Sequence, residues 1–231
     1  MNRVYVPASG VEDWKSRLAE PEKHWKPRYS AHSLANTWQT SASETTTGFP
    51  RDVASVLGMN PGLSELQVLL ALPEHEVPLP GGSRPSQTDL WLLARSKSGL
   101  VSIAVEGKVD ESFGPTLSEW QDGASEGKRK RLDFMLRLLG LSAEPPGNTR
   151  YQLLHRTASA VIEAQRFIAP QALMLVHSFS QSDASLSDYQ AFLALFGVAG
   201  DVNQVVSAGT RSDVHLHFAW VRSPFPDSEP K

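Results

Sequence analysis

Two strand-forming runs separated by a short turn constrain this chain more than any other feature of its sequence. Residues 88–95 and residues 100–109 are rich in strand-forming side chains, and residues 96–99 between them are turn formers. In the second run, the period of two separates the apolar side chains on one face from Glu106 and Lys108 on the other. The pattern predicts an antiparallel hairpin with one apolar and one charged face.

The length of the turn determines which residues of the two strands face each other. If the turn has four residues, Arg95 pairs with Leu100, and Asp89 then lies directly opposite Glu106 on the charged face. If the register slips by two residues, Asp89 faces Lys108 instead, and all three charged side chains still share one face. Directly opposed residues have Cβ atoms ~4.5–5.5 Å apart, and like charges at that distance are destabilising.

Two opposed carboxylates are an arrangement that a hard divalent cation can stabilise, because such ions prefer oxygen ligands. We therefore predict that Asp89 and Glu106 bind Mg²⁺, with Mn²⁺ as an alternative. Lys108 would assist water activation and offset charge on a phosphoryl group, and Gly107 would let a metal or the backbone come close. The plain alternative is an exposed strand pair with a solvated salt bridge, worth only ~0–1 kcal/mol.

The rest of the chain predicts an α/β fold with a mixed sheet and helices packed on its faces. The expected order is a helix, a β-meander and then helix and strand units. Strands are expected at residues 66–72, 88–95, 100–109, 172–179 and 214–221, and helices at residues 30–39, 51–57, 128–139, 151–167 and 187–196.

The 231 residues leave room for one domain with an extension. Residues 1–40 differ from the rest, since aromatic side chains are spread through a stretch rich in Pro and Lys: Tyr5, Trp14, Trp25, Tyr29 and Trp38. We predict that this segment is an aromatic-rich extension packed on the core. Residues 41–231 are then expected to form a single domain.

Composition excludes several classes of function. The chain has no cysteine, which removes disulfides, thiolate metal sites and cysteine nucleophiles. Its formal net charge of −3 argues against coating nucleic acid by bulk charge, so any such contact would be local. The apolar runs are too short to span a membrane, and no leader is evident, so we expect a cytoplasmic protein without a membrane partner.

At this point the sequence resembles a known group of enzymes. Asp89 on one strand and Glu106-Gly107-Lys108 on the next, within the helix, meander, helix and strand order of residues 30–179, are similar to the PD-(D/E)XK (restriction-endonuclease-like) nuclease superfamily. The strings SQTDLWLLAR, VEGKVDESFGPTLSEW and RYQLLHRTASAVIEAQRF also resemble a bacterial domain family of unknown function.

The superfamily resemblance implies a restriction-endonuclease-like core. It also implies that Asp89 and Glu106 are metal ligands, that the Gly107 carbonyl is a further ligand and that Lys108 is the catalytic lysine. Many members add a glutamate from the first helix. Gln39 and Glu44 are the residues available for that position here, so the number of metals stays open.

Two helices carry further candidate residues. On the helix of residues 151–167, a polar stripe contains Gln152, His155 and Arg156, which the resemblance makes candidates for supporting the site or binding phosphate. The other helix opens with the basic run Lys128-Arg129-Lys130-Arg131, where cations oppose the helix dipole unless an anion binds. The alternative for both is a solvated polar face.

Together these patterns predict a Mg²⁺-dependent phosphodiesterase, an endo- or exonuclease acting on nucleic acid, most simply DNA. The alternative is a catalytically inactive protein on the same scaffold that serves as a binding or assembly module. A homodimer is left open by the sequence.

Overall fold

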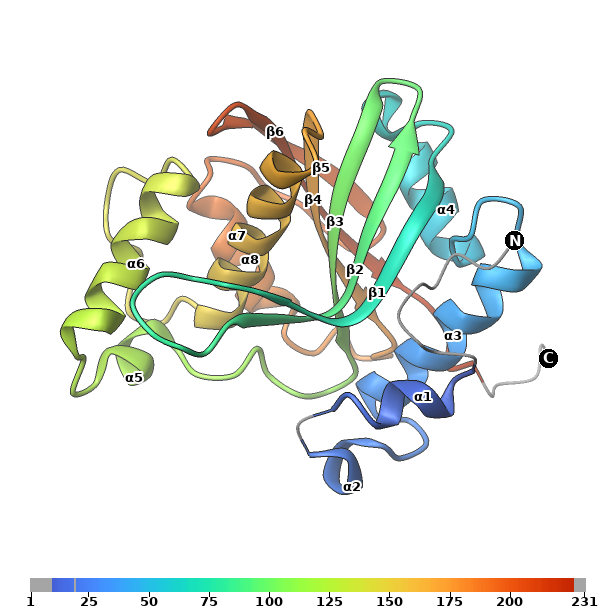
Figure 1. Cartoon of the computed structure of the whole chain (residues 1–231), viewed down its shortest axis with the longest axis horizontal. Helices are drawn as coiled ribbons and strands as arrows, with labels where there is room; N and C mark the ends of the chain where they lie inside the picture. The colour runs from blue at the N-terminus through green and yellow to red at the C-terminus, as the bar shows by residue number, and fades with distance from the viewer. Residues whose placement is uncertain (1–9, 19, 227–231) are drawn as a thin grey trace.

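A six-stranded mixed sheet forms the centre of the computed structural model, which describes residues 10–18 and 20–226 (Figure 1). The strands are β1 (Gln67–Val77), β2 (Ser86–Ser96), β3 (Gly99–Lys108), β4 (Gln171–Ser178), β5 (Gln204–Arg211) and β6 (Val214–Arg222). Their spatial order is β1-β2-β3-β4-β6-β5. The first three strands form an antiparallel meander, β3, β4 and β6 run parallel, and β5 pairs antiparallel with β6. The prediction of a mixed α/β fold is confirmed.

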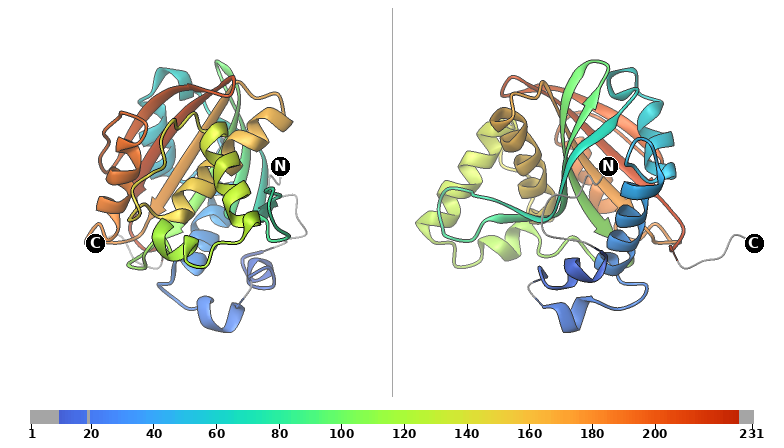
Figure 2. Two further views of the ribbon diagram at one scale, coloured as in Figure 1. Left: turned by 90° about the vertical axis from the view of Figure 1, so that its left-hand side faces the viewer. Right: turned by 45° about the vertical axis from the view of Figure 1, so that its right-hand side comes forward.

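Helices cover both faces of the sheet and divide the core into two apolar layers (Figure 2). One layer lies under α5 (Leu117–Gln121), α6 (Glu126–Leu138), α7 (Tyr151–Arg166) and α8 (Leu186–Ala194). The other lies under α1 (Glu12–Lys15), α3 (Ser30–Glu44) and α4 (Arg51–Gly58). The short helix α2 (Pro21–His24) contributes no buried residue, and a 3₁₀ turn, η1 (Pro61–Leu63), leads into β1.

The predicted hairpin register is correct. Arg95 pairs with Leu100, and Leu90 pairs with Val105. The turn is tighter than expected, since Ser96 and Gly99 also pair and only two residues lie between them. Val105 lies in the apolar layer under α3 and α4, whereas Glu106 and Lys108 point to the opposite face. The same register continued by one step places Asp89 opposite Glu106.

The structure extends or adds elements that the patterns did not predict. β1 continues five residues past the predicted end at Leu72, and α3 continues past Gln39 to Glu44. β5 was not predicted. Its register shifts between Ser207 and Gly209, and its burial alternates weakly, which are the features of a short outer strand rather than of a core strand.

Aromatic side chains from the described part of the N-terminal segment pack against the sheet. Trp14 and Trp38 are buried in the layer under α3 and α4, and Trp25 packs against that layer. Tyr29 is 45% exposed, and Tyr5 lies outside the described residues. The helix α3 crosses residue 40, where the extension was expected to end; the division of the chain at that point stays a prediction. Among the described residues, no helix is long and apolar enough to cross a membrane.

Candidate active site

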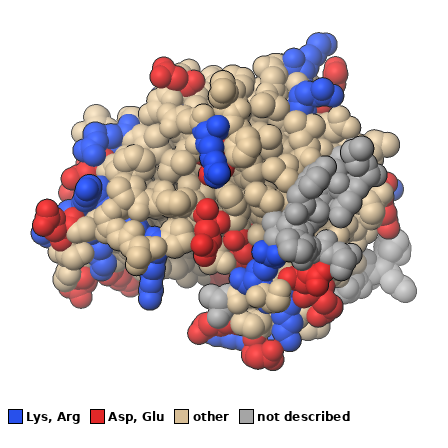
Figure 3. Space-filling view, in the orientation of Figure 1, with Lys and Arg blue, Asp and Glu red and all other residues tan. Residues whose placement is uncertain are grey.

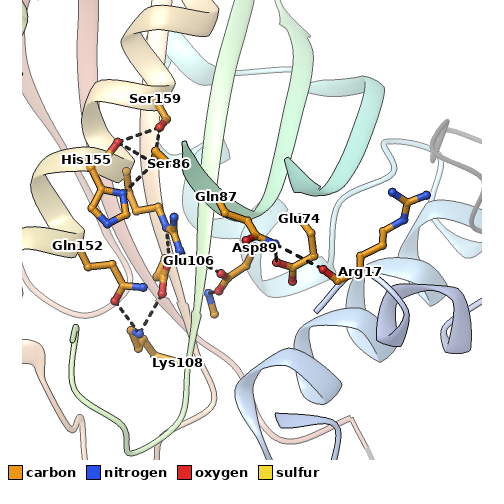
Figure 4. A network of polar contacts seen from close by, with 12 residues as sticks. Arg17, Glu74, Ser86, Gln87, Asp89, Glu106, Lys108, Gln152, His155 and Ser159 are labelled. Carbon is orange, nitrogen blue, oxygen red and sulfur yellow. Dashed lines mark hydrogen bonds and ion pairs between the residues drawn. The ribbon is translucent and has the colours of Figure 1, made fainter. Parts of the chain in front are cut away.

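A cavity of about 400 Å³ opens where β2 and β3 reach α7 and the N-terminal segment. Charged and amide side chains from four elements line it (Figure 4): Glu74, Gln87, Asp89, Glu106, Lys108, Gln152 and Arg156. The facing wall comes from α2 with the residues before it and from the start of α3: Leu18, Glu20, His24, Ser30 and Ala31. The three residues on which the sequence prediction depends, Asp89, Glu106 and Lys108, therefore share one cavity.

Among the acidic side chains that line this cavity, Glu106 is the most enclosed, with 2% of its surface exposed. Its Oε1 accepts a hydrogen bond from Lys108 Nζ at 2.9 Å, and its Oε2 accepts one from Arg156 Nε at 2.6 Å. Burial alone would raise the pKa of Glu106, yet the charges of Arg156 and Lys108 beside it lower that pKa to about 2. Glu106 is therefore a carboxylate at neutral pH.

Asp89 is more open, with 24% of its side chain exposed. Its Oδ2 accepts a hydrogen bond from the Gly107 backbone N–H at 2.9 Å, and its Oδ1 lies 3.5 Å from Arg156 Nη2. Burial, followed by the charge of Glu106, raises the pKa of Asp89 to about 7. The two carboxyl groups thus differ widely in proton affinity, as neighbouring groups at functional sites often do.

Lys108 is buried, with 3% exposure, and its ammonium group is held by named acceptors. Nζ donates to Glu106 at 2.9 Å, to Gln152 Oε1 at 3.1 Å and, over a longer distance of 3.4 Å, to the Ser112 carbonyl. The ammonium also lies 4.8 Å from the centre of the Phe113 ring. These contacts fix the lysine over the carboxylates.

The helix α7 supplies two of the predicted supporting residues. Its apolar stripe packs on the sheet, which turns Gln152 and Arg156, one turn apart, toward the end of β3. His155 points elsewhere, since its Nδ1 lies 2.7 Å from Ser86 Oγ. Burial lowers the pKa of His155 well below its ordinary value, so the ring is neutral. His155 anchors the start of β2.

Glu74 is a site residue that the sequence analysis did not select. The pairs Pro73↔Leu90 and His75↔Thr88 flank it, so that Glu74 lies across from Asp89. Its φ of 52° is in the left-handed region, which is uncommon for a residue with a side chain. Gln87 Nε2 donates to Glu74 Oε2 at 3.0 Å. Burial, followed by the charge of Asp89, raises the pKa of Glu74 well above its ordinary value.

The basic run of α6 does not line this cavity. Lys128 Nζ donates to the Trp120 carbonyl at 2.6 Å, and Arg129 donates to the Ala124 carbonyl at 2.8 Å. Arg131 donates to the carbonyls of Leu79, Pro80 and Gly82, and so holds the loop between β1 and β2 against α6. Lys130 is exposed. A phosphate contact of this run stays a prediction.

The first helix does not bring a glutamate to the cavity. Gln39 accepts a hydrogen bond from Trp14 Nε1 at 3.0 Å, and Glu44 is exposed at the far end of α3. Within residues 10–18 and 20–226, no cluster of three or more His, Asp or Glu side chains has an arrangement that could hold a metal ion. Asp89, Glu106 and Gly107, the three residues predicted to hold a metal, all line the cavity, and their role as ligands stays a prediction.

Comparison with known proteins places the chain in a family. A family model described as a domain of unknown function, DUF6946, matches residues 7–225. The chain belongs to the DUF6946 family. No curated protein and no solved structure matches it. The description of this family assigns it no activity.

Proposed function

We propose that this protein is a Mg²⁺-dependent phosphodiesterase that hydrolyses nucleic acid with water as nucleophile. The observation that supports this most is the meeting of Asp89, Glu106 and Lys108 in one cavity, with Gln152 and Arg156 behind them. Two carboxylates, a lysine and an arginine beside an open space are a combination suited to binding a phosphate diester and a cation together.

The donor chemistry of the cavity fits a hard divalent cation. Two cations, Lys108 and Arg156, line the cavity together with five carboxyl groups, so the cavity carries excess negative charge when all are ionised; the carboxyl groups are those of Glu20, Glu74, Asp89, Glu106 and Glu111. Asp89 and Glu106 would hold Mg²⁺, which prefers oxygen ligands and commonly keeps several waters. When bound, the ion would lower the pKa of water and neutralise charge on the phosphoryl oxygens.

The chain's own residues supply binding and orientation. Arg156, held against Glu106, presents a guanidinium group that can meet a phosphate oxygen. Lys108 can exchange its 3.4 Å contact with the Ser112 carbonyl for a substrate or water oxygen while it keeps its bonds to Glu106 and Gln152. Positive charge is thereby placed where negative charge grows during the displacement.

The element order supports the same proposal. The helix α3, the meander β1-β2-β3, the helix α7 and the parallel strand β4 follow one another in the order that the PD-(D/E)XK resemblance implies. Asp89 lies on the second of these strands and Glu106 and Lys108 at the end of the third. Shared topology does not carry an activity by itself, so the weight of the proposal lies on the site.

One observation favours the alternative, an inactive binding or assembly module. Both oxygens of Glu106 already accept hydrogen bonds, from Lys108 and Arg156. To hold a metal, Glu106 must share or exchange one of these contacts. If this network only stabilises the fold, Glu106 keeps both hydrogen bonds and binds no metal.

Cleavage of circular DNA tests the proposal. Circular single-stranded DNA and supercoiled plasmid are incubated with the protein and Mg²⁺ or Mn²⁺, and a parallel reaction contains EDTA. We expect nicking or degradation that EDTA abolishes and that Asp89→Asn and Lys108→Met each reduce by ~10²-fold or more.

A matched control is Asp133→Asn, which makes the same change at an exposed position of α6. It should cleave like the wild type. Cleavage that persists in Asp89→Asn would assign the activity to a contaminant or another site. Absence of cleavage of both substrates by the wild type with either metal would favour the module.

A further inference from the structure

Asp89 and Glu106, with Lys108 beside them, form what we call the acidic centre. It lies at the bottom of a hollow rather than on a convex surface. Glu106 and Lys108 are 2% and 3% exposed, and Asp89 is the most open of the three. Leu18, Glu20, His24, Ser30 and Ala31 line the cavity from the N-terminal segment, whose described part is residues 10–18 and 20–31. A phosphodiester that reacts here must enter this space. In duplex DNA the phosphates lie along the outside of a stiff rod, whereas a single strand can bend into a groove.

A second hollow of about 430 Å³ adjoins the first and shares wall residues with it. Three of its lining side chains are cationic, Lys23, Lys26 and Arg28, against the two acidic ones, Asp110 and Glu111. Figure 3 shows charges of both signs gathered on the lower part of this face, where α1 and α2 lie in Figure 1. The hollow therefore places the cationic side chains of Lys26 and Arg28 next to the acidic centre.

Lys26 and Arg28 lie beside aromatic rings, whereas Lys23 is paired with Glu20 at 2.9 Å. Lys26 Nζ lies 5.6 Å from the centre of the Tyr29 ring, and the Arg28 guanidinium lies 5.4 Å from that of Phe225. Tyr29 is 45% exposed. Basic side chains with an exposed aromatic ring are the combination that binds single-stranded nucleic acid, because phosphates meet the cations and a base can stack on the ring.

A third hollow of about 500 Å³ lies on the other side of the centre, behind Glu74 and Gln87, which it shares with the first. Arg17 lines it. The Nε atom of Arg17 is buried and has no hydrogen-bond partner within the part of the chain that the structure describes. A buried hydrogen-bond donor without an acceptor lowers the free energy of unfolding, and a bound anion that accepts from the donor removes this cost.

We propose that a single strand of nucleic acid lies in the groove formed by these three hollows, between the N-terminal segment and the ends of β1, β2 and β3. Its phosphates contact Lys26 and Arg28 on one side of the acidic centre and Arg17 on the other, and a base stacks on Tyr29. Cleavage of the strand in this groove rests on the proposed function. Binding of the strand in the groove does not depend on that function.

Fluorescence anisotropy of a labelled oligothymidylate of about 16 nucleotides, measured in EDTA over a range of salt concentrations, tests the groove. The same length of duplex is measured in parallel. We expect the single strand to bind more tightly than the duplex. Lys26→Ala/Arg28→Ala should weaken that binding by about tenfold or more and reduce the slope of log affinity against log salt by roughly 1.4, because each phosphate contact with a single strand contributes about 0.7.

The matched control is Arg95→Ala/Lys97→Ala. It also removes one arginine and one lysine two residues apart, from exposed positions at the opposite end of the hairpin. Binding by this control should equal that of the wild type. Tyr29→Ala should weaken binding while the salt slope stays the same, because stacking releases no counterions.

Equal or tighter binding of the duplex, equal losses in the two double variants, or no binding of the single strand would each overturn the groove. The two proposals fail separately. Binding that follows the expected pattern without any cleavage keeps the groove and removes only the hydrolysis. Cleavage by a protein that fails these binding criteria keeps the hydrolysis and removes the groove.

Discussion

Arg156 on α7 donates a 2.6 Å hydrogen bond to Glu106 at the end of β3, and both side chains are buried. The same guanidinium lies 3.5 Å from Asp89 on β2. One arginine thus connects the two carboxyl groups that are the centre of the proposed site. Because breaking a buried ion pair leaves an uncompensated charge, this contact should matter for stability as well as for function.

The first prediction concerns this arginine. Arg156→Met leaves Glu106 buried with Lys108 as its remaining cation, and we expect the free energy of unfolding to fall by about 3–5 kcal/mol in urea denaturation. Arg166→Met on the same helix is the control, since Arg166 is 63% exposed and should cost less than about 1 kcal/mol. Equal losses in the two variants would show that the Glu106 contact is no stronger than a surface pair.

The second prediction concerns Asp89. Its carboxyl group is partly buried near Glu106. Burial and this like charge raise the pKa of Asp89 to about 7 despite the nearby Arg156, so the ionised form of Asp89 opposes folding. In EDTA at slightly alkaline pH, Asp89→Asn should raise the free energy of unfolding by about 1 kcal/mol or more, while cleavage is lost. The amide oxygen can still accept from Gly107. A variant that is less stable than the wild type would contradict this account.

The third prediction concerns a buried network away from the site. Trp38 Nε1 donates to His177 Nδ1 at 3.0 Å, and His177 Nε2 lies 2.9 Å from Ser223 Oγ, which joins α3, β4 and the residue after β6. Trp38→Phe leaves the His177 acceptor unpaired, and we expect a loss of about 1–3 kcal/mol in thermal or chemical unfolding. Trp25→Phe, at a partly buried indole, should cost less.

The fourth prediction is the pH dependence that His177 confers. Burial lowers the pKa of His177 to about 3, whereas an unfolded histidine titrates near ~6.5. Between these values the unfolded chain binds a proton that the folded chain does not, so stability decreases as the pH falls from about 6.5 toward 3. The slope of unfolding free energy against pH in this window should be smaller in His177→Asn. Identical slopes would exclude the contribution of His177.

Local pattern was sufficient to predict the hairpin at the centre of the site. The period of two in residues 100–109 puts Asp89, Glu106 and Lys108 on one face in either of the two registers that the turn allows, and the structure has the register with Arg95 opposite Leu100. The spacing of Gln152 and Arg156 on α7 likewise follows from helical periodicity. These features depend on neighbours in sequence or on a single turn.

Features that depend on distant contacts could not be predicted. Glu74 reaches the site only because β1 continues beyond Leu72 and pairs with β2 across a long loop, whose length leaves the register open. Its positive φ gives no signal in the sequence. The contacts of Arg131 with the loop between β1 and β2 could not be predicted either, because the partners are about fifty residues apart in the sequence. Within the basic run, the carbonyls that Arg131 contacts are about fifty residues away in the sequence, whereas those that Lys128 and Arg129 contact are near neighbours.

Calorimetric titration of Mg²⁺ into the metal-stripped protein measures whether Asp89 and Glu106 together bind a divalent cation. We expect saturable binding at millimolar Mg²⁺ by the wild type and by Asp133→Asn, and loss of that binding in Asp89→Asn. Absence of binding by the wild type, or equal binding by Asp89→Asn, would show that these carboxyl groups do not hold the ion.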